Sequence, residues 1–302
     1  MQKGFTLIEI LISISITLVI GVAVFQLFQQ NERVFNDQNL VTEMQQGARA
    51  AIFQAADRIR TAGQGVPMYA ETYGDSPSEE TVAILFGSSA TRINFRAGIA
   101  PAETFVVAPT PTSFSIGSPM TVTVNDAIGF YNAVGGAPIG RFVYFWGASD
   151  TSGWLWVRAS INGITPSINR VAVTPSSVGP AGNTGGMVQF PTFPTMSLEE
   201  VTAIYLDAST NSMRQTTATV MSDPVHPSWA PANELSSNVT ELQFEYFDHF
   251  GNPVIPDILS NRSRIERIEI RLVVQTAQEL RNHTRPTFAL SVQTNIRNAR
   301  IH

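Results

Sequence analysis

The chain has 302 residues, of which 43% are hydrophobic and 14% charged, and its formal net charge is -5 at pH 7. This length allows one large or two small globular units beyond an anchoring segment, and the acidic balance gives no global attraction to nucleic acid or anionic lipid. Because the sequence contains no cysteine, a disulfide, a thiol nucleophile and a cysteine metal site are excluded.

The amino-terminal region contains a long apolar segment. From Ile10 to Phe28 there is no charged residue, and these 19 residues are close to the ~20 that span a bilayer as a helix. Lys3 precedes the segment, so the positive-inside rule places the amino terminus in the cytoplasm. We therefore expect a single-pass anchor in residues 5–28.

Glu9 lies at the edge of this segment, where a carboxylate is costly and needs a partner. Cleavage between Gly4 and Phe5 would create an amine four residues earlier, about 6 Å away along a helix. The pair could form within one chain or between neighbouring chains. An ordinary secretory signal cut near Gly21-Val22-Ala23 is the alternative, but it leaves Glu9 unexplained.

A resemblance to a known family rests on the segment Lys3-Gly4-Phe5-Thr6-Leu7-Ile8-Glu9. It is similar to the class III leader of type IV prepilins and type II secretion pseudopilins. In that family a membrane peptidase cuts after the glycine and methylates the new amino terminus. The resemblance implies a leader over residues 1–4, cleavage between Gly4 and Phe5, N-methylation of Phe5 and an assembly role for Glu9. The implied partners are prepilin peptidase, major and minor pilins, the inner-membrane assembly platform and the lipid bilayer.

Helical periodicity continues beyond the membrane segment through residues 29–63. Apolar residues recur at three- and four-residue spacing: Leu40, Met44, Ala48, Ala51, Ile52, Ala55 and Ile59. Gly63, Gly65 and Pro67 then stop the helix. We predict one helix from Phe5 to Ala62, roughly 87 Å long, that lays this stripe on the head. Direct binding of a partner by the stripe is the alternative.

Residues 64–302 predict a β-rich head, and the fold class is therefore α+β, pilin-like. The predicted strands are Thr81 to Phe86, Arg92 to Phe95, Thr104 to Val107, Met120 to Val124, Arg141 to Trp146, Trp154 to Arg158, Asn169 to Val173, Val201 to Asp207, Ser212 to Thr216, Val239 to Phe247, Arg264 to Gln275 and Thr287 to Thr294. Residues 174–197 are rich in Pro, Gly and Ser and predict a long exposed loop.

Looser patterns resemble PilW-like minor pilins, the counterparts of J-type pseudopilins. They comprise Ala48-Arg49-Ala50-Ala51, Ile59-Arg60-Thr61-Ala62-Gly63, Val201 to Asp207 with Met213-Arg214, Asn238 to Tyr246, Ile265 to Val274, and Asn295-Ile296-Arg297-Asn298. The resemblance divides the head into PilW-like strands at 201–302 and an unmatched stretch at 68–200, which is a possible insertion or variable region.

The sequence contains no Gly-x-Ser-x-Gly, His-Glu-x-x-His or P-loop motif, so we expect neither an enzyme nor a cofactor or metal site. The histidines fall in turns or at the terminus: His226, His249, His283 and His302. The loop 248–252 could offer oxygens to calcium, as could Asp257 nearby, but its Asn and Gly favour a hairpin turn.

Residues 262–300 are rich in arginine, and glutamates interleave with the arginines. The arginines are Arg262, Arg264, Arg267, Arg271, Arg281, Arg285, Arg297 and Arg300. Alternation with Glu266, Glu269 and Glu279 favours a salt-bridged solvent face over a nucleic-acid patch. Phe244, Tyr246, Phe247 and Phe250 are expected to be sheet core.

These features predict a minor pilin or pseudopilin subunit that initiates or caps assembly of a type IV pilus. We expect it in the bacterial inner membrane with its carboxy-terminal head in the periplasm, and in the filament after processing. One alternative is a tip subunit of the type II secretion pseudopilus. Another is a tip-located adhesin or DNA-binding module formed by residues 68–200.

Overall fold

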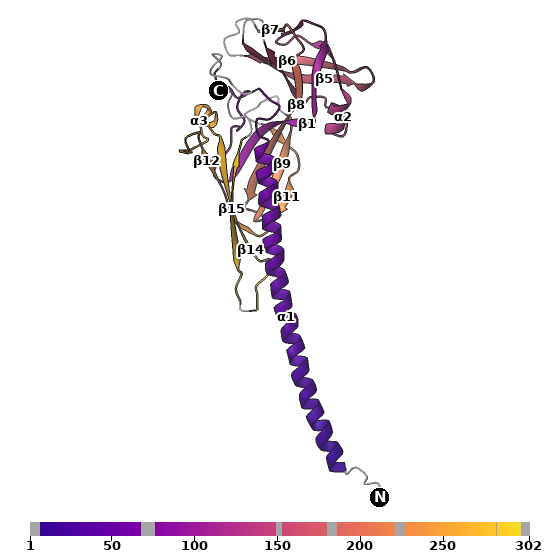
Figure 1. Ribbon diagram of the computed structural model, residues 1–302, viewed down its shortest axis with the longest axis vertical. Coiled ribbons are helices and arrows are strands. Elements are labelled where there is room, and N and C mark those ends of the chain that lie inside the picture. The colour runs from indigo at the N-terminus through magenta and orange to yellow at the C-terminus, as the bar shows by residue number, and fades with distance from the viewer. Residues whose placement is uncertain are drawn as a thin grey trace.

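A long helix forms the stalk of the molecule. The computed structural model describes residues 7–67, 76–148, 153–179, 186–220, 227–281 and 283–296. Helix α1 (Leu7–Arg60) has 54 residues, about 81 Å at 1.5 Å per residue. Figure 1 shows its lower part projecting from the head, which lies alongside its upper end. The predicted long helix is thus confirmed over the described residues, although it ends two residues before Ala62.

Glycines terminate α1 and attach its end to the head. Gly63 and Gly65 have φ values of 77° and 68°, a conformation that glycine adopts without steric cost. The Gly63 N–H donates to the Arg96 carbonyl over 2.8 Å, and the Gly98 N–H donates to the Gln64 carbonyl over 2.6 Å. A Cβ atom on Gly98 would lie 3.0 Å from the Gly65 carbonyl oxygen. The predicted glycine stop is confirmed, and it fixes the helix against strand β1.

The larger sheet has nine strands in the order β1-β3-β6-β5-β4-β8-β9-β10, with β11 paired to β9. Its strands are β1 (Arg92–Ala108), β3 (Met120–Val124), β4 (Phe142–Ala148), β5 (Trp154–Thr165), β6 (Arg170–Gly179), β8 (Thr195–Asp207), β9 (Ser212–Val220), β10 (Ser228–Trp229) and β11 (Asn233–Ser236). Because β1 also pairs with β8, the strands β1-β3-β6-β5-β4-β8 close into a six-stranded barrel.

The barrel has a hydrophobic core of its own. Its members include Val106, Val143, Phe145, Val157, Val171, Met196 and Leu198. Phe114 and Phe190, from the two-stranded ribbon of β2 (Thr112–Ser115) and β7 (Met187–Phe190), also belong to it. So does Phe130 of α2 (Ile128–Ala133). In Figure 1 these elements form the part of the head farthest from the free end of α1.

A second core lies lower in the head, around α1. The four-stranded sheet β13-β12-β14-β15 consists of β12 (Val239–Phe247), β13 (Pro253–Val254), β14 (Arg267–Gln275) and β15 (Thr287–Asn295). Helix α1 buries the upper part of its predicted stripe here, whereas Leu40 and Met44 are only partly buried. The buried residues, which include Ala56, are Ala48, Ala51, Ile52, Ala55, Ala56 and Ile59. They share a core with Phe244, Ile270 and Leu272. The prediction that the stripe packs on the head is confirmed.

Two long strands join the cores. The lower parts of β1 and β8 pair from Arg92↔Tyr205 to Gly98↔Glu199, and their upper parts pair from Glu103↔Ser197 to Phe105↔Thr195. The sequence division proposed at residue 200 falls inside β8. The barrel is therefore continuous with the lower part of the head through the paired strands β1 and β8.

Three sequence predictions about the head are wrong. Residues 174–197 are not one exposed loop, because β6 continues to Gly179, β7 follows and β8 begins at Thr195. Buried and exposed residues alternate along parts of β6 and β7, as is typical of strands. The Pro and Gly residues of the segment led to the prediction of a loop. Residues 81–86 form a single bridge, Ile84↔Phe95, instead of a strand. Phe250 is 81% exposed, outside the sheet core, whereas Phe244 and Tyr246 are buried.

Candidate functional site

The candidate assembly site is the amino-terminal part of α1. Glu9 lies in the first turn of the described helix, where a carboxylate is favoured by the helix dipole. Its side chain is exposed to the surroundings of the monomer. Gly4 and Phe5, the predicted cleavage and methylation residues, lie outside the described residues, and so does the amine proposed as the partner of Glu9.

The few polar side chains near Glu9 satisfy their own hydrogen bonds. The Ser13 hydroxyl donates to the Glu9 carbonyl, Ser15 to Leu11 and Thr17 to Ser13, each over 2.8 Å. Such bonds to the carbonyl four residues earlier remove the cost of placing a hydroxyl in lipid. Glu9 is the acidic residue of this stretch, and a carboxylate in a membrane helix costs more than a hydroxyl does.

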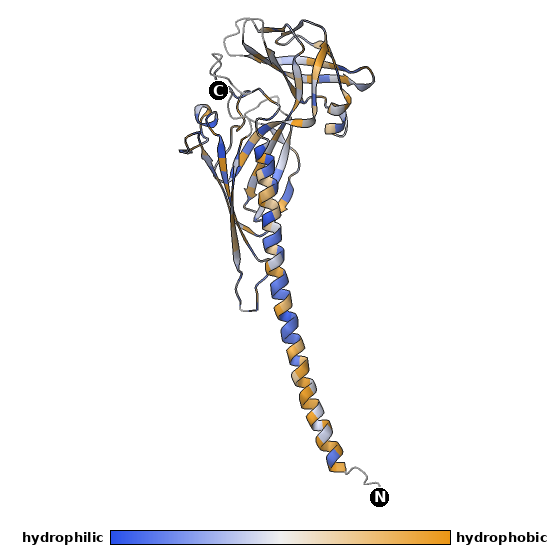
Figure 2. Ribbon diagram, in the orientation of Figure 1, coloured by the Kyte–Doolittle hydropathy of each residue, from blue (hydrophilic) through white to orange (hydrophobic). Residues whose placement is uncertain are grey.

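The apolar part of α1 is not covered by the head. Among the described residues, α1 is the one helix long and apolar enough to cross a membrane, with a mean hydropathy of 2.6 over its best window and none of that window buried. Figure 2 shows hydrophobic residues predominating along the lower stalk and hydrophilic ones above them. Gly21 has nothing within 4 Å of its potential Cβ, so no packing within the monomer requires a glycine there.

Residues 1–25 match the model of the family described as the prokaryotic N-terminal methylation motif. The chain carries a type IV pilin-like class III leader. The search of curated proteins and the search of solved structures each found no match to this chain.

The match over residues 1–25 supports an amino terminus of the type IV pilin or pseudopilin type, a class of structural subunits. It implies processing by prepilin peptidase and assembly with other pilins. Together with the apolar helix behind it, the leader supports anchoring in the membrane.

The Asp248 loop is a hairpin turn, as favoured from the sequence. Asp248 Oδ1 accepts the N–H groups of Phe250 and Asn252 over 2.9 and 2.8 Å, and Gly251 has φ 82°. These bonds occupy the oxygens that a calcium ion would need. In the part of the chain that the structure describes, no group of three His, Asp or Glu side chains could hold a metal. His249 and His283 are exposed, and His226 and His302 lie outside the described residues.

The arginines near the carboxyl terminus do not form one patch. Arg271 Nε lies 3.6 Å from Glu241 Oε1 on the solvent face, as predicted. Arg262 is instead buried, and its two terminal nitrogens donate to both oxygens of Glu79 over 2.6 and 2.8 Å. Arg297 and Arg300 lie outside the described residues.

Sequence reasoning missed a buried ion cluster between the two cores. Glu199 of β8 lies 2.6 Å from Arg96 Nε of β1 and 2.8 Å from Arg158 Nη2 of β5. Arg96 also donates to the Glu79 carbonyl, and the Tyr144 hydroxyl donates to the Glu80 carbonyl. The available signal was a charged residue inside an apolar strand, as in the run Trp-Leu-Trp-Val-Arg158 of β5. This cluster is enclosed and has no route for a substrate.

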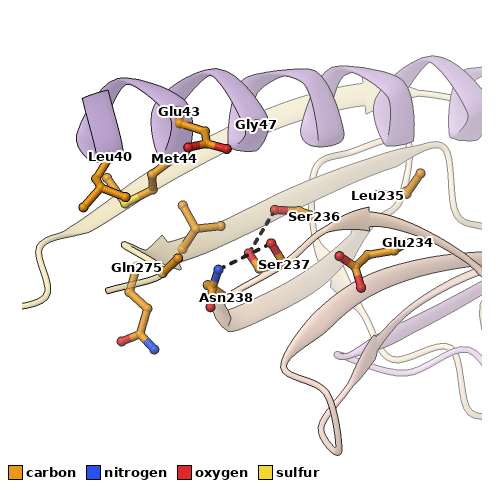
Figure 3. Close-up of a pocket in the computed structure, with 12 residues that line it drawn as sticks. Leu40, Glu43, Met44, Gly47, Glu234, Leu235, Ser236, Ser237, Asn238 and Gln275 are labelled. Carbon is orange, nitrogen blue, oxygen red and sulfur yellow. Dashed lines mark hydrogen bonds between the residues drawn. The ribbon is translucent and has the colours of Figure 1, made fainter. Parts of the chain in front are cut away.

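A cleft of ≈ 290 Å³ lies between α1 and the lower ends of the two sheets. Figure 3 shows Glu43 and Met44 of α1 on one side of it and the segment 234–238 on the other. The Ser236 hydroxyl donates to the Ser237 carbonyl over 3.3 Å, and Asn238 Nδ2 donates to Ser237 Oγ over 3.4 Å. Glu43 and Glu234 are exposed, and the lining contains no histidine. It offers hydrogen-bonding groups but no nucleophile with an adjacent base.

Proposed function

We propose that this chain is a minor pilin-type subunit that helps to initiate or cap a type IV pilus. It is anchored in the inner membrane by α1, with its head in the periplasm, until the leader is removed and the subunit enters the filament. The observation that carries the proposal is the match of residues 1–25 to the N-terminal methylation motif, together with an apolar helix segment that the head does not bury. A helix that the head leaves uncovered is available first to lipid and then to the helices of other subunits.

The minor role is supported by the looser PilW-like patterns in α1 and the head. Ala48, Ala51 and Ile59, which belong to those patterns, are all buried against the head. The patterns at Val201 to Asp207 and Asn238 to Tyr246 fall on β8 and β12, the strands that build the lower core. The same leader serves type II secretion, so a pseudopilus tip subunit is the alternative within this class.

Glu9 provides the test of the proposal. Glu9→Gln removes the charge but keeps the size. Ser13→Ala, about 6 Å further along the helix, changes an uncharged polar group in the same segment. We expect both variants to be inserted and cleaved, because both residues lie beyond the cut. Glu9→Gln should co-purify poorly with the other pilins, since a buried pair that loses one charge costs ~3–5 kcal/mol. Ser13→Ala should co-purify normally. Equal recruitment of wild type and Glu9→Gln would refute the assembly role of this carboxylate.

A binding role at the filament tip is a second candidate, favoured by the separate core of the barrel at the end of the head opposite the membrane segment. The register gives the end points of a deletion, which also removes Tyr144 and Trp156 from the lower core. Gly98 and Glu199 are paired residues of β1 and β8, so residues 99–198 can be replaced by Asn-Gly, a two-residue turn that suits a β-hairpin.

If the barrel serves assembly, this deletion abolishes filaments although the shortened chain still reaches the membrane and is cleaved. If the barrel binds a surface or DNA, filaments form in normal number and adhesion or DNA uptake is lost. Unaltered filaments with unaltered adhesion and uptake would exclude both roles for the barrel. Circular dichroism of the purified variant, with retained helix and strand signals, serves as the folding control.

A further inference from the structure

The hairpin between β14 and β15 extends along α1 toward the apolar segment, as Figure 1 shows. The hairpin is closed at its base, where the Thr276 N–H donates to the Pro286 carbonyl over 3.2 Å. Nearer its tip, the Arg281 N–H donates to Asp37 Oδ2 of α1 over 3.4 Å. Beside this contact lies a cleft of ≈ 240 Å³ lined by Gln26, Gln29, Gln30, Arg33 and Arg281. Through this contact and this cleft, the hairpin brings the head close to the end of the apolar segment of α1.

The position of this cleft along α1 corresponds to the surface of a bilayer. The charge-free apolar run ends at Phe28, and the cleft begins at Gln26 and ends at Arg33. Arg33 is five residues beyond Phe28, about 7.5 Å along the helix axis. The headgroup layer is about 5–7 Å thick on each side of the hydrocarbon. If Phe28 marks the hydrocarbon boundary, both arginines of the cleft lie at the level of the lipid phosphates.

The charge of the cleft is unbalanced. Its lining contains two guanidinium groups and three amides but no carboxylate. Within the described residues, neither guanidinium has a carboxylate oxygen within 4.0 Å. Glu32, the neighbour of Arg33, points about 100° away around the helix and is not part of the lining. The nearby Asp37 carboxylate accepts the backbone N–H of Arg281 but is paired with neither guanidinium. Two cations that line one cleft favour an anion, and the planar guanidinium matches a phosphate with paired hydrogen bonds.

We propose that Arg33 and Arg281 bind the phosphate of an anionic phospholipid in the leaflet next to the head. The hairpin then holds the head at a fixed height above the bilayer until the subunit is extracted. The location at the end of the apolar run favours a lipid over another protein, because Gln26 already belongs to the membrane segment. The proposal requires α1 to span the bilayer but does not depend on the role of the chain in a filament.

The chain offers a matched control for this site. Arg285 lies on the same hairpin and is exposed, but it does not line the cleft. The test compares wild type, Arg33→Gln/Arg281→Gln and Arg285→Gln, each as the full chain purified alone in detergent micelles. An equal mixture of phosphatidylglycerol and phosphatidylcholine is added, and bound lipid is counted by native mass spectrometry. A parallel titration uses inorganic phosphate without lipid.

We expect wild type and Arg285→Gln to retain phosphatidylglycerol in preference to phosphatidylcholine. The double variant should retain about tenfold less, as expected when charge-assisted hydrogen bonds to one phosphate are lost. All three proteins should unfold at the same temperature, because these side chains are exposed. Equal retention by the double variant overturns the proposal. Displacement of the lipid by millimolar inorganic phosphate also overturns it, because the cleft would then be a site for free anions. The chain is purified alone, so a negative result leaves the assembly role of Glu9 untouched.

Discussion

Arg96 and Glu199 form an ion pair with no solvent access, with Nε and Oε1 2.6 Å apart. They come from strands β1 and β8, which run through both cores of the head. Arg158 adds a second cation 2.8 Å from Oε2, and its guanidinium carbon lies 3.7 Å from the centre of the Phe142 ring. The cluster therefore connects the barrel to the lower head at the point where the two meet.

Loss of the shared carboxylate should destabilise the head strongly. Glu199→Gln removes the buried carboxylate that two guanidinium groups share, and breaking a buried ion pair costs about 3–5 kcal/mol. The control is Asp207→Asn. Asp207 lies 3.2 Å from Arg214 in a pair that is partly exposed, where the loss should be below about 1 kcal/mol. Thermal unfolding of the full chain in detergent, followed by tryptophan fluorescence, measures both. Similar effects of the two substitutions would show that the cluster does not carry this stability.

The same cluster predicts a pH dependence of stability. Burial acts to raise the pKa of Glu199, but Arg158 and Arg96 outweigh it and hold that pKa below its ordinary value of 4.5. A carboxyl group with a lowered folded pKa stabilises the protein above its unfolded pKa, and this contribution disappears as the pH falls through the folded pKa. The wild-type head should therefore lose stability below about pH 4.5. Glu199→Gln should lose less over the same interval, and parallel curves would argue against the assignment.

Adjacent residues of α1 provide a test of how the helix docks. Ile52 is fully buried in the lower core, whereas Phe53 is 62% exposed. Ile52→Ala should lower the free energy of unfolding by ~2–5 kcal/mol, because it leaves a cavity. Phe53→Ala should change it by less than about 0.5 kcal/mol. Chemical denaturation of both variants gives the comparison, and a larger loss for Phe53→Ala would mean that the helix packs through a different face.

Processing of the leader is tested at Gly4. We expect mature protein to begin at Phe5 with a methylated amino group, which intact-mass measurement detects. Gly4→Val should accumulate as unprocessed precursor, because the bulky side chain occupies the position before the cut. Gln2→Ala, in the same leader but away from the cut, should be processed normally. A mature chain beginning at Met1 or Val24 would contradict this prediction.

The lower core was predictable because local periodicity and tertiary packing agree there. The stripe from Ala48 to Ile59 is buried on the predicted face, and β12 covers the predicted range from Val239 to Phe247. Agreement fails at residues 174–197, where Pro175 and Gly179 suggested a loop but lie in β6, paired with β5. Pro175 is tolerated in β6 because it lies at a β-bulge. The register of the pairing with β5 shifts there, between Arg158 and Ala159.

The sequence by itself determined the leader, the membrane segment and the position of Glu9, because these depend on order along the chain and on the hydrophobic length needed to cross a bilayer. It also determined where α1 ends, since Gly63 and Gly65 require no partner to stop a helix. Only the tertiary structure decided that β1 and β8 close a barrel, that Arg96, Arg158 and Glu199 meet in its base, and that Arg281 lies beside Arg33. These residues are separated by 41 to 248 positions in the chain, and no local pattern encodes which strand edges pair or which charges are buried together.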